Sequence, residues 1–407
     1  MSHTRVDKIK TWWRTHVKIP LGVKIAICVF PVIATALFYL LQSSVGVMNW
    51  AVSYISNPAR STFAFLSAIY PIALFEIFAT ALGLFLIYYI IKSIRDSWRR
   101  RNRWKLLGRR FLPIIVATFY LWGAFCWIWN SGYFATGFAE KYDLTNDGVN
   151  RSDLVAVTRH FAEKANELSL LVERDEDGKY IMHRQTMFAE SVDIYKNVSK
   201  EFPSLNGRLY TPKPMYLYSW LMSITGYSGM YFALTGEAMI NIQPPGLYMP
   251  STVAHEHAHK LGVFAEDEAN FVAILACITS DNPTFQYAGY MLGLNYLLAA
   301  IAFPENLFSS SFSEEWLEIS ASLTREIERD RLDNWEFWAK TRTSNIGVEF
   351  IDNILSNVME VTRDVVDNIY DDFLQSQNQE LGLRSYGACV DLLVEYFKDS
   401  LHMPQEP

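Results

Sequence analysis

A short histidine-rich segment, His255-Glu256-His257-Ala258-His259, carries the residues best suited to chemistry. Residues four apart lie on one face of a helix, so His255 and His259 could bind one metal ion. Imidazole nitrogens are common zinc ligands, and a catalytic zinc site keeps one position open for water. Glu256, about 100° around the helix from His255, could take a proton from that water as a general base. His257 faces away from the pair, and we expect it to be structural or solvent-facing.

Three acidic residues, Glu266, Asp267 and Glu268, follow a glycine turn and could supply a third ligand. We favour Glu266, with Glu268 as the alternative because geometry near a helix start is soft. Glu266 and Asn270 share a helix face, and this pair resembles a helix of the glutamate-ligand zinc peptidases. In those enzymes the glutamate binds zinc, and a residue four positions later supports a ligand histidine. The competing interpretation is a polar surface helix whose acidic residues favour the helix start.

Three apolar runs, at about 21–42, 71–91 and 111–133, precede this segment. A helix needs about 20 apolar residues to cross the hydrocarbon core of a bilayer, and each run meets that length. We therefore expect three transmembrane helices within a membrane domain of residues 1–137. Glu76 lies inside the second run, where an isolated acid is expected to snorkel to the surface or to stay protonated.

The distribution of charge predicts how the chain is oriented. Residues 1–24 carry six Lys or Arg and residues 92–110 carry nine, whereas residues 43–70 carry one. Basic segments stay cytoplasmic, so residues 138–407 are expected outside the cytoplasm, tethered to the plasma membrane by a multi-pass anchor. The basic segments could also contact anionic membrane lipids. Residues 138–407 carry 20 basic and 40 acidic residues, a balance that argues against a nucleic-acid partner.

The outer region is expected to be mostly α-helical with a small sheet. One or two strands are predicted within 206–250, followed by a helix that Ser251 caps and Gly262 stops, and by a second helix at about 265–280. The apolar stretch 286–303 is predicted to be a buried core helix, with a fourth span as the alternative. Cys277 and Cys389 could form a disulfide or remain buried thiols.

Three segments, at 228–241, 251–277 and 384–397, resemble the bacterial membrane-protein family known as domain of unknown function 3810. They read SGMYFALTGEAMIN, STVAHEHAHKLGVFAEDEANFVAILAC and RSYGACVDLLVEYF. The resemblance implies a membrane-anchored, glutamate-ligand zinc peptidase with an α+β zincin-like (gluzincin-like) domain. It also implies that the strand at about 229–242 forms a sheet edge that pairs with extended substrate, with Glu237 either lining that edge or lying in a surface loop.

The favoured function is therefore zinc-dependent hydrolysis of peptide bonds in a peptide or protein substrate. Zn²⁺ would be held by His255, His259 and Glu266 or Glu268, with Glu256 as the general base. Tyr386 is the candidate donor to the oxyanion, although a packed aromatic residue is its plainer interpretation. The alternative function is a membrane-bound sensor or scaffold whose zinc domain has little or no turnover.

Overall fold

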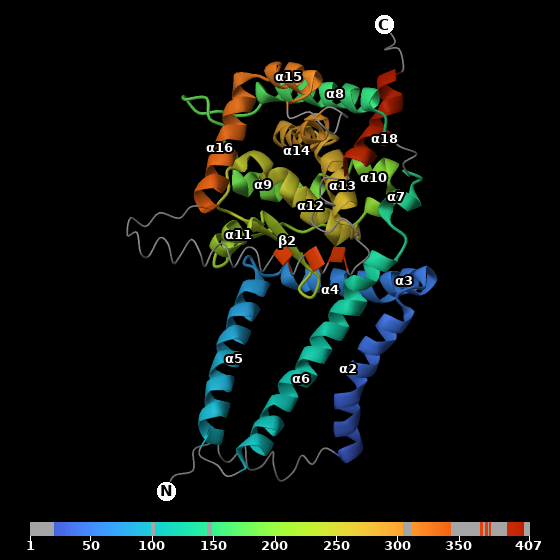
Figure 1. The fold of residues 1–407 in the computed structure, drawn as a ribbon, viewed down its shortest axis with the longest axis vertical. Helices are drawn as coiled ribbons and strands as arrows, with labels where there is room; N and C mark the ends of the chain where they lie inside the picture. The colour runs from blue at the N-terminus through green and yellow to red at the C-terminus, as the bar shows by residue number, and fades with distance from the viewer. Residues whose placement is uncertain are drawn as a thin grey trace.

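The computed structural model describes residues 20–98, 102–144, 149–303, 311–342, 367–368, 371–372, 374–375 and 389–402. Three long helices form one layer, and a mostly helical domain with a small sheet lies against their ends (Figure 1). We call it the outer domain for its place beyond the ends of these helices. The mostly α-helical class predicted from the sequence is confirmed. The division after residue 137 stays a prediction.

The long helices are α2 (Leu21–Leu41), α5 (Leu74–Trp98) and α6 (Arg103–Ile128). Within the described residues, these three helices are long and apolar enough to cross a membrane. Both α5 and α6 extend further into the basic segment 92–110 than the apolar runs indicate. Lys and Arg are good helix formers, and their long stems let the charged ends reach water, so helix continues beyond the apolar part.

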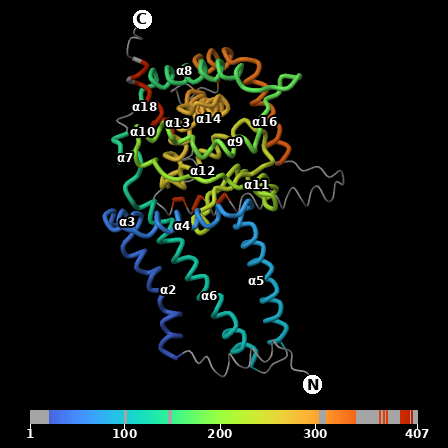
Figure 2. Tube along the Cα trace, turned by 180° about the vertical axis from the view of Figure 1, so that it is seen from behind, coloured from blue at the N-terminus to red at the C-terminus, as the bar shows by residue number. Residues whose placement is uncertain are grey.

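A helical connection joins α2 to α5, and it consists of α3 (Val45–Ala51), the π-helix η1 (Val52–Ser56) and α4 (Asn57–Ser67). Two opposite views show α3 and α4 lying across the ends of the long helices, beneath the outer domain (Figures 1 and 2). Arg60, the single charged residue of this connection, is buried. The connection therefore separates the membrane helices from the site described below.

The outer domain begins after the 3-10 turn η2 (Asn130–Phe134). Its further helical elements are α7 (Phe138–Lys141), α8 (Arg151–Ser169), α9 (Arg184–Glu190), η3 (Ser191–Asp193), α10 (Val198–Glu201), η4 (Pro203–Leu205), α11 (Ser219–Thr225), η5 (Gly246–Tyr248), α12 (Met249–Leu261), α13 (Glu266–Ile278), α14 (Pro283–Ile301), α15 (Glu314–Ala321), α16 (Arg325–Arg342) and α18 (Cys389–His402). Helix α14 packs against α8 and α13 inside the main hydrophobic core, so the predicted core helix is confirmed and a fourth span is wrong.

The sheet has three strands, β1 (Lys213–Met215), β2 (Gly229–Phe232) and β3 (Glu237–Asn241), in the order β1-β3-β2. Strand β3 pairs in parallel with β1 and antiparallel with β2. The sequence predicted one or two strands here and missed β1, which is only three residues long. Strand β2 is at one edge of the sheet and lies against α12.

Two details of the prediction are corrected by the structure. Ser251 is not the helix cap, because α12 begins at Met249 with Pro250 in its first turn, where a proline ring fits without loss of a hydrogen bond. The predicted stop is confirmed, since Gly262 ends α12 with a left-handed φ of 100°. Cys277 and Cys389 are both buried free thiols, so the disulfide is wrong.

Candidate metal centre

The site forms where α12 and α13 pack against each other. The Nε2 atom of His255 lies 3.1 Å from Glu266 Oε2, and the Nε2 atom of His259 lies 3.5 Å from the same oxygen. All three side chains are buried, and their ligand atoms lie within 4.8 Å of one another. The structure therefore brings together His255, His259 and Glu266 as a group that could hold a metal ion.

Each imidazole is fixed through its other ring nitrogen. His255 Nδ1 donates to Asn270 Oδ1 at 2.9 Å, and the Asn270 amide donates in turn to the Tyr296 hydroxyl. His259 Nδ1 donates to the Val263 carbonyl at 2.8 Å, just beyond the glycine that ends α12. The Nε2 atoms of both rings therefore face Glu266 and are the ring nitrogens placed to bind a metal ion.

The donor set fits zinc by type and spacing. Two ligands at ~2.0–2.1 Å from a tetrahedral zinc ion lie roughly 3.3 Å apart, and the two distances to Glu266 fall on either side of this value. Burial alone would raise the pKa of Glu266, but the charge of His259 and hydrogen bonds from both histidines hold it well below its usual range. Glu266 is therefore a carboxylate, the form that binds a metal.

Glu256 lies beside this cluster and under the edge strand. A Cβ atom on Gly229 would lie 2.4 Å from Glu256 Oε1, so a larger residue there would have to displace the carboxylate or the strand. The Tyr231 amide of the same strand donates to Glu256. Burial raises the pKa of Glu256 to about 7, partly offset by the charges of His255 and His259. A carboxylate with this pKa can accept and return a proton near neutral pH.

The membrane-proximal segments form one wall of the site. The Trp129 ring, directly after α6, packs edge-on against the His259 ring with centroids 5.5 Å apart. From α4, Arg60 donates to the carbonyl oxygens of His259 and Lys260, and its guanidinium lies over the Phe264 ring. Sequence reasoning missed both residues, because the aromatic and the cation are more than 100 positions from the histidines they contact.

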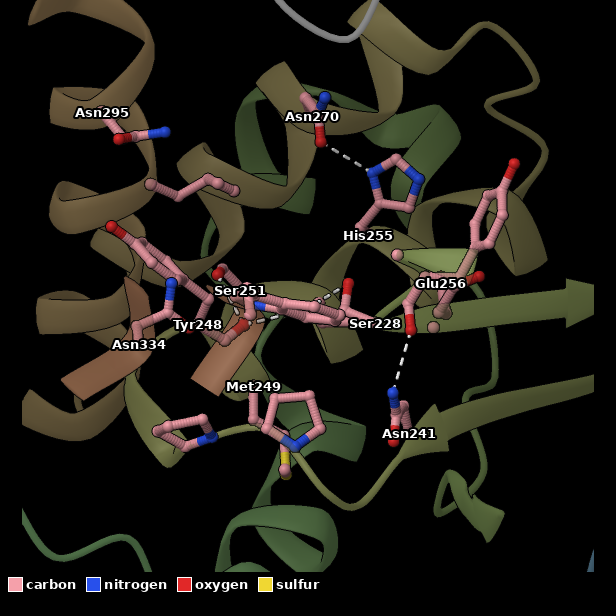
Figure 3. Close-up of a pocket in the computed structure, with 18 of the residues that line it drawn as sticks. Ser228, Asn241, Tyr248, Met249, Ser251, His255, Glu256, Asn270, Asn295 and Asn334 are labelled. Atoms are coloured by element: carbon pink, nitrogen blue, oxygen red, sulfur yellow. Dashed lines mark hydrogen bonds between the residues drawn. The ribbon is translucent and has the colours of Figure 1, made fainter. Parts of the chain in front are cut away.

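A cleft of about 620 Å³ opens at His255 and Glu256 (Figure 3). Its rim includes Ser228 and Gly229 of the edge-strand region, and its far side includes Tyr248 and Asn334. Among the described lining residues, Glu256 and Asp367 are the acids, and none is Lys or Arg. The cleft also contains the Tyr227 side chain, whose pKa is raised by burial and further by the Asp367 and Glu266 charges. A hydroxyl donor is thus available beside the cluster.

Several residues singled out in the sequence lie elsewhere. The Glu268 carboxylate accepts from the Ala139 amide at the start of α7, at 2.8 Å, and is not part of the metal-binding group. His257 is buried rather than solvent-facing, with its Nε2 atom 3.3 Å from Ser191 Oγ. Tyr386 lies outside the described residues.

Two other acids turn out to join the outer domain to the second membrane helix. Glu237 is buried and accepts from the Leu74 and Phe75 amides at the start of α5, so it does not line the substrate edge. Glu76 accepts from the backbone amides of residues 216–218. Glu76 is buried and held by these three bonds, so the expectation that it snorkels to the surface is wrong.

Helices able to span a membrane, a small sheet and a buried cluster of two histidines and a glutamate define a membrane-associated protein with a candidate metal centre. The chain belongs to the family described as protein of unknown function (DUF3810), whose family model matches residues 53–394. The resemblance noted from the sequence is thus confirmed. Searches of curated proteins and of solved structures found no match.

Proposed function

We propose that this protein is a membrane-anchored, zinc-dependent metallopeptidase. One observation carries the proposal: His255, His259 and Glu266 converge beside a cleft that His255 and Glu256 line, and Glu256 lies under an edge strand. Two imidazoles and a carboxylate leave a fourth zinc position open, which is the arrangement of a catalytic rather than a structural site. Each residue reaches its position from the two packed helices α12 and α13.

In this proposal the residues divide the chemistry of hydrolysis among them. A bound zinc ion would supply Lewis acidity, which polarises a carbonyl and makes a water more acidic. Glu256 takes the proton from the attacking water and passes it to the nitrogen of the leaving amine, so the carboxylate ends as it began. We propose Tyr227 as the donor to the carbonyl oxygen because it lines the cleft, and the role of Tyr386 stays a prediction from the sequence.

An extended peptide is the substrate that suits the edge strand. The backbone N–H of Asn241 donates to the Ser228 carbonyl, and hydrogen-bonded pairs alternate with non-hydrogen-bonded pairs along the antiparallel strands β2 and β3. The backbone N–H and C=O groups of Gly229 and Tyr231 therefore point away from β3. A peptide laid along this edge could pair with Gly229 beside Glu256. The acidic charge of residues 138–407 and the acids of the cleft make nucleic acid an unsuitable partner. The distribution of Lys and Arg favours a site outside the cytoplasm.

The test uses the full chain purified in detergent, with metal analysis and a peptide library as substrate. We expect about one zinc per chain, which the substitution His255→Ala removes. Glu256→Gln should retain zinc and lose hydrolysis, whereas Glu163→Gln on the exposed face of α8 should change neither. Absence of zinc from the wild-type protein would contradict the proposal. Zinc binding without hydrolysis that depends on Glu256 would favour the sensor or scaffold.

A further inference from the structure

The chain between Lys213 and Glu237 has an unusual composition for an acidic domain. Its 23 residues, 214–236, include no Asp, Glu, Lys, Arg or His, although residues 138–407 carry 60 charged ones. This uncharged segment contains β2 and α11, and three tyrosines and a tryptophan lie within residues 216–227. Figure 1 places α11 and β2 on the side of the outer domain that faces the long helices, and Figure 2 shows α11 on that side again.

Hydrogen bonds hold the start of this segment against the first two turns of α5. Glu76 accepts from the amides of Tyr216, Leu217 and Tyr218 at 3.1, 2.7 and 3.0 Å. The Tyr218 hydroxyl shares a 2.7 Å hydrogen bond with Thr80 Oγ1. Thr80 is six residues into α5, roughly 9 Å along the helix axis. The loop that precedes α11 therefore lies alongside the beginning of a helix able to span a membrane.

Large apolar side chains on this loop and in the first turn of α11 are exposed. Tyr216 is 63% exposed, and Leu217 and Trp220 are each 53% exposed. Ile77 and Phe78 of α5, next to the Glu76 that holds the loop, are also exposed. Tyr and Trp are enriched where a bilayer meets water, because their rings are apolar at one end and polar at the other.

We propose that Tyr216, Leu217 and Trp220 form a lipid-contacting anchor, which inserts into the outer interface of the bilayer that α5 crosses. The bilayer is the occupant because the loop continues the lipid-facing surface of α5. The anchor would attach the outer domain to the membrane in addition to the three helices that are able to span it. It would also hold the cleft close to the bilayer, because the end of α11 at Thr225 and the residues 226–229 directly after it line the cleft. The anchor does not depend on the proposed hydrolysis.

The experiment measures how deeply position 217 lies in a bilayer. A nitroxide is attached to Leu217→Cys in the full chain, in a Cys28→Ala background, because Cys126, Cys277 and Cys389 are buried. The protein is placed in phosphatidylcholine–phosphatidylglycerol vesicles, and collisions with oxygen and with a water-soluble nickel chelate are recorded. The matched control is Leu171→Cys, which is 67% exposed and follows α8 on the far side of the outer domain.

We expect the label at 217 to collide more with oxygen than with nickel, and the label at 171 to show the reverse. Equal behaviour at the two positions would overturn the anchor. Protection of position 217 from both reagents would also overturn it, and would indicate a protein partner or a second copy. A label at Tyr216→Cys, with gel filtration to verify folding, gives an independent reading if the first variant misfolds.

Discussion

Arg60 of the membrane-proximal helix donates from Nη1 to the main-chain oxygen of the candidate ligand His259, at 2.7 Å. The Arg60 side chain is fully buried and donates to carbonyl groups in the last turn of α12, where the His259 carbonyl also accepts from the Gly262 amide. A cation is also favourable at the negative end of a helix dipole. Arg60 thus joins the segment between two candidate spans to the helix that carries both histidines.

Replacing Arg60 should weaken the metal centre from a distance. We expect Arg60→Leu to lower the free energy of unfolding by roughly 2–3 kcal/mol, because buried carbonyls lose a charged donor. Arg60→Lys should fall between this variant and wild type, since lysine keeps the charge but not the fork of donors. Thermal unfolding in detergent measures the loss of stability, and zinc titration measures the weakening of metal binding. The control is Arg159→Leu, which removes an exposed ion pair with Glu318. Equal losses in Arg60→Leu and Arg159→Leu would show that Arg60 has no special role.

Asn270 should set the metal affinity through His255. We expect Asn270→Ala to weaken zinc binding about 10–100-fold, because the imidazole loses the acceptor that orients it. Asn270→Asp should bind at least as tightly as wild type, since a carboxylate is a stronger acceptor for the same nitrogen. Competition with a chromophoric chelator gives the affinities. Asn295→Ala alters the same cleft without touching the hydrogen bond to His255, and a similar loss there would contradict the role of Asn270.

Gly229 should matter for turnover but not for metal binding. Because an added Cβ atom would lie 2.4 Å from Glu256 Oε1, Gly229→Ala must displace the carboxylate or the edge strand. We expect kcat to fall while zinc content stays at the wild-type level. Gly46→Ala is the matched substitution, since its Cβ atom meets nothing within 4 Å. Unchanged kcat in Gly229→Ala would argue against Glu256 as the general base.

Tyr227 is tested by removing its hydroxyl. If it donates to the developing oxyanion, Tyr227→Phe should lower kcat by about 100-fold or more with unchanged zinc affinity. Steady-state kinetics on a peptide from the library gives kcat and KM separately. Tyr248→Phe is the control, because Tyr248 lies across the cleft from Glu256 in Figure 3. A fall confined to KM would indicate that Tyr227 only binds substrate.

His160 on α8 should make the fold sensitive to acid. Burial, together with the charge of Lys164, lowers the pKa of His160 below its ordinary value of 6.5. The unfolded chain therefore binds the proton more tightly than the folded protein. The contribution of His160 to the free energy of unfolding is fully present above pH 6.5, and it declines as the pH falls toward the lowered pKa of the folded state. We expect His160→Gln to lose less Tm than wild type between about pH 8 and about pH 5. An equal loss of Tm in His160→Gln and in wild type would contradict this role of His160.

Helix α12, which carries the two histidines, could be predicted because the pattern that specifies it is local in the sequence. Two histidines four positions apart share a helix face whatever surrounds them, and Gly262 stops the helix by its own conformational freedom. The preference for Glu266 over Glu268 rested on the same periodicity. The structure shows why Glu266 and Glu268 differ in role: the Glu268 carboxylate accepts from the backbone of α7, 129 positions away in the sequence.

The remainder of the site depends on contacts that periodicity cannot predict. In the sequence, Arg60 appeared only as the one basic residue of the segment 43–70, and Trp129 appeared only as part of the apolar run 111–133. Their roles arise from how α4 and the end of α6 pack beneath α12. Glu76 and Glu237 were misplaced for the same reason, since each binds backbone amides more than 130 positions away.

The wall formed by Arg60 and Trp129 also affects biogenesis. Both residues are synthesised well before His255, as part of the segments that must enter the bilayer first. A chain that failed to insert would present α12 without its buried cation and without the indole against His259. Under the proposed function, the nascent hydrolase would lack this wall of its site until it reached its membrane. Proteins in the cytosol would therefore not be hydrolysed by it.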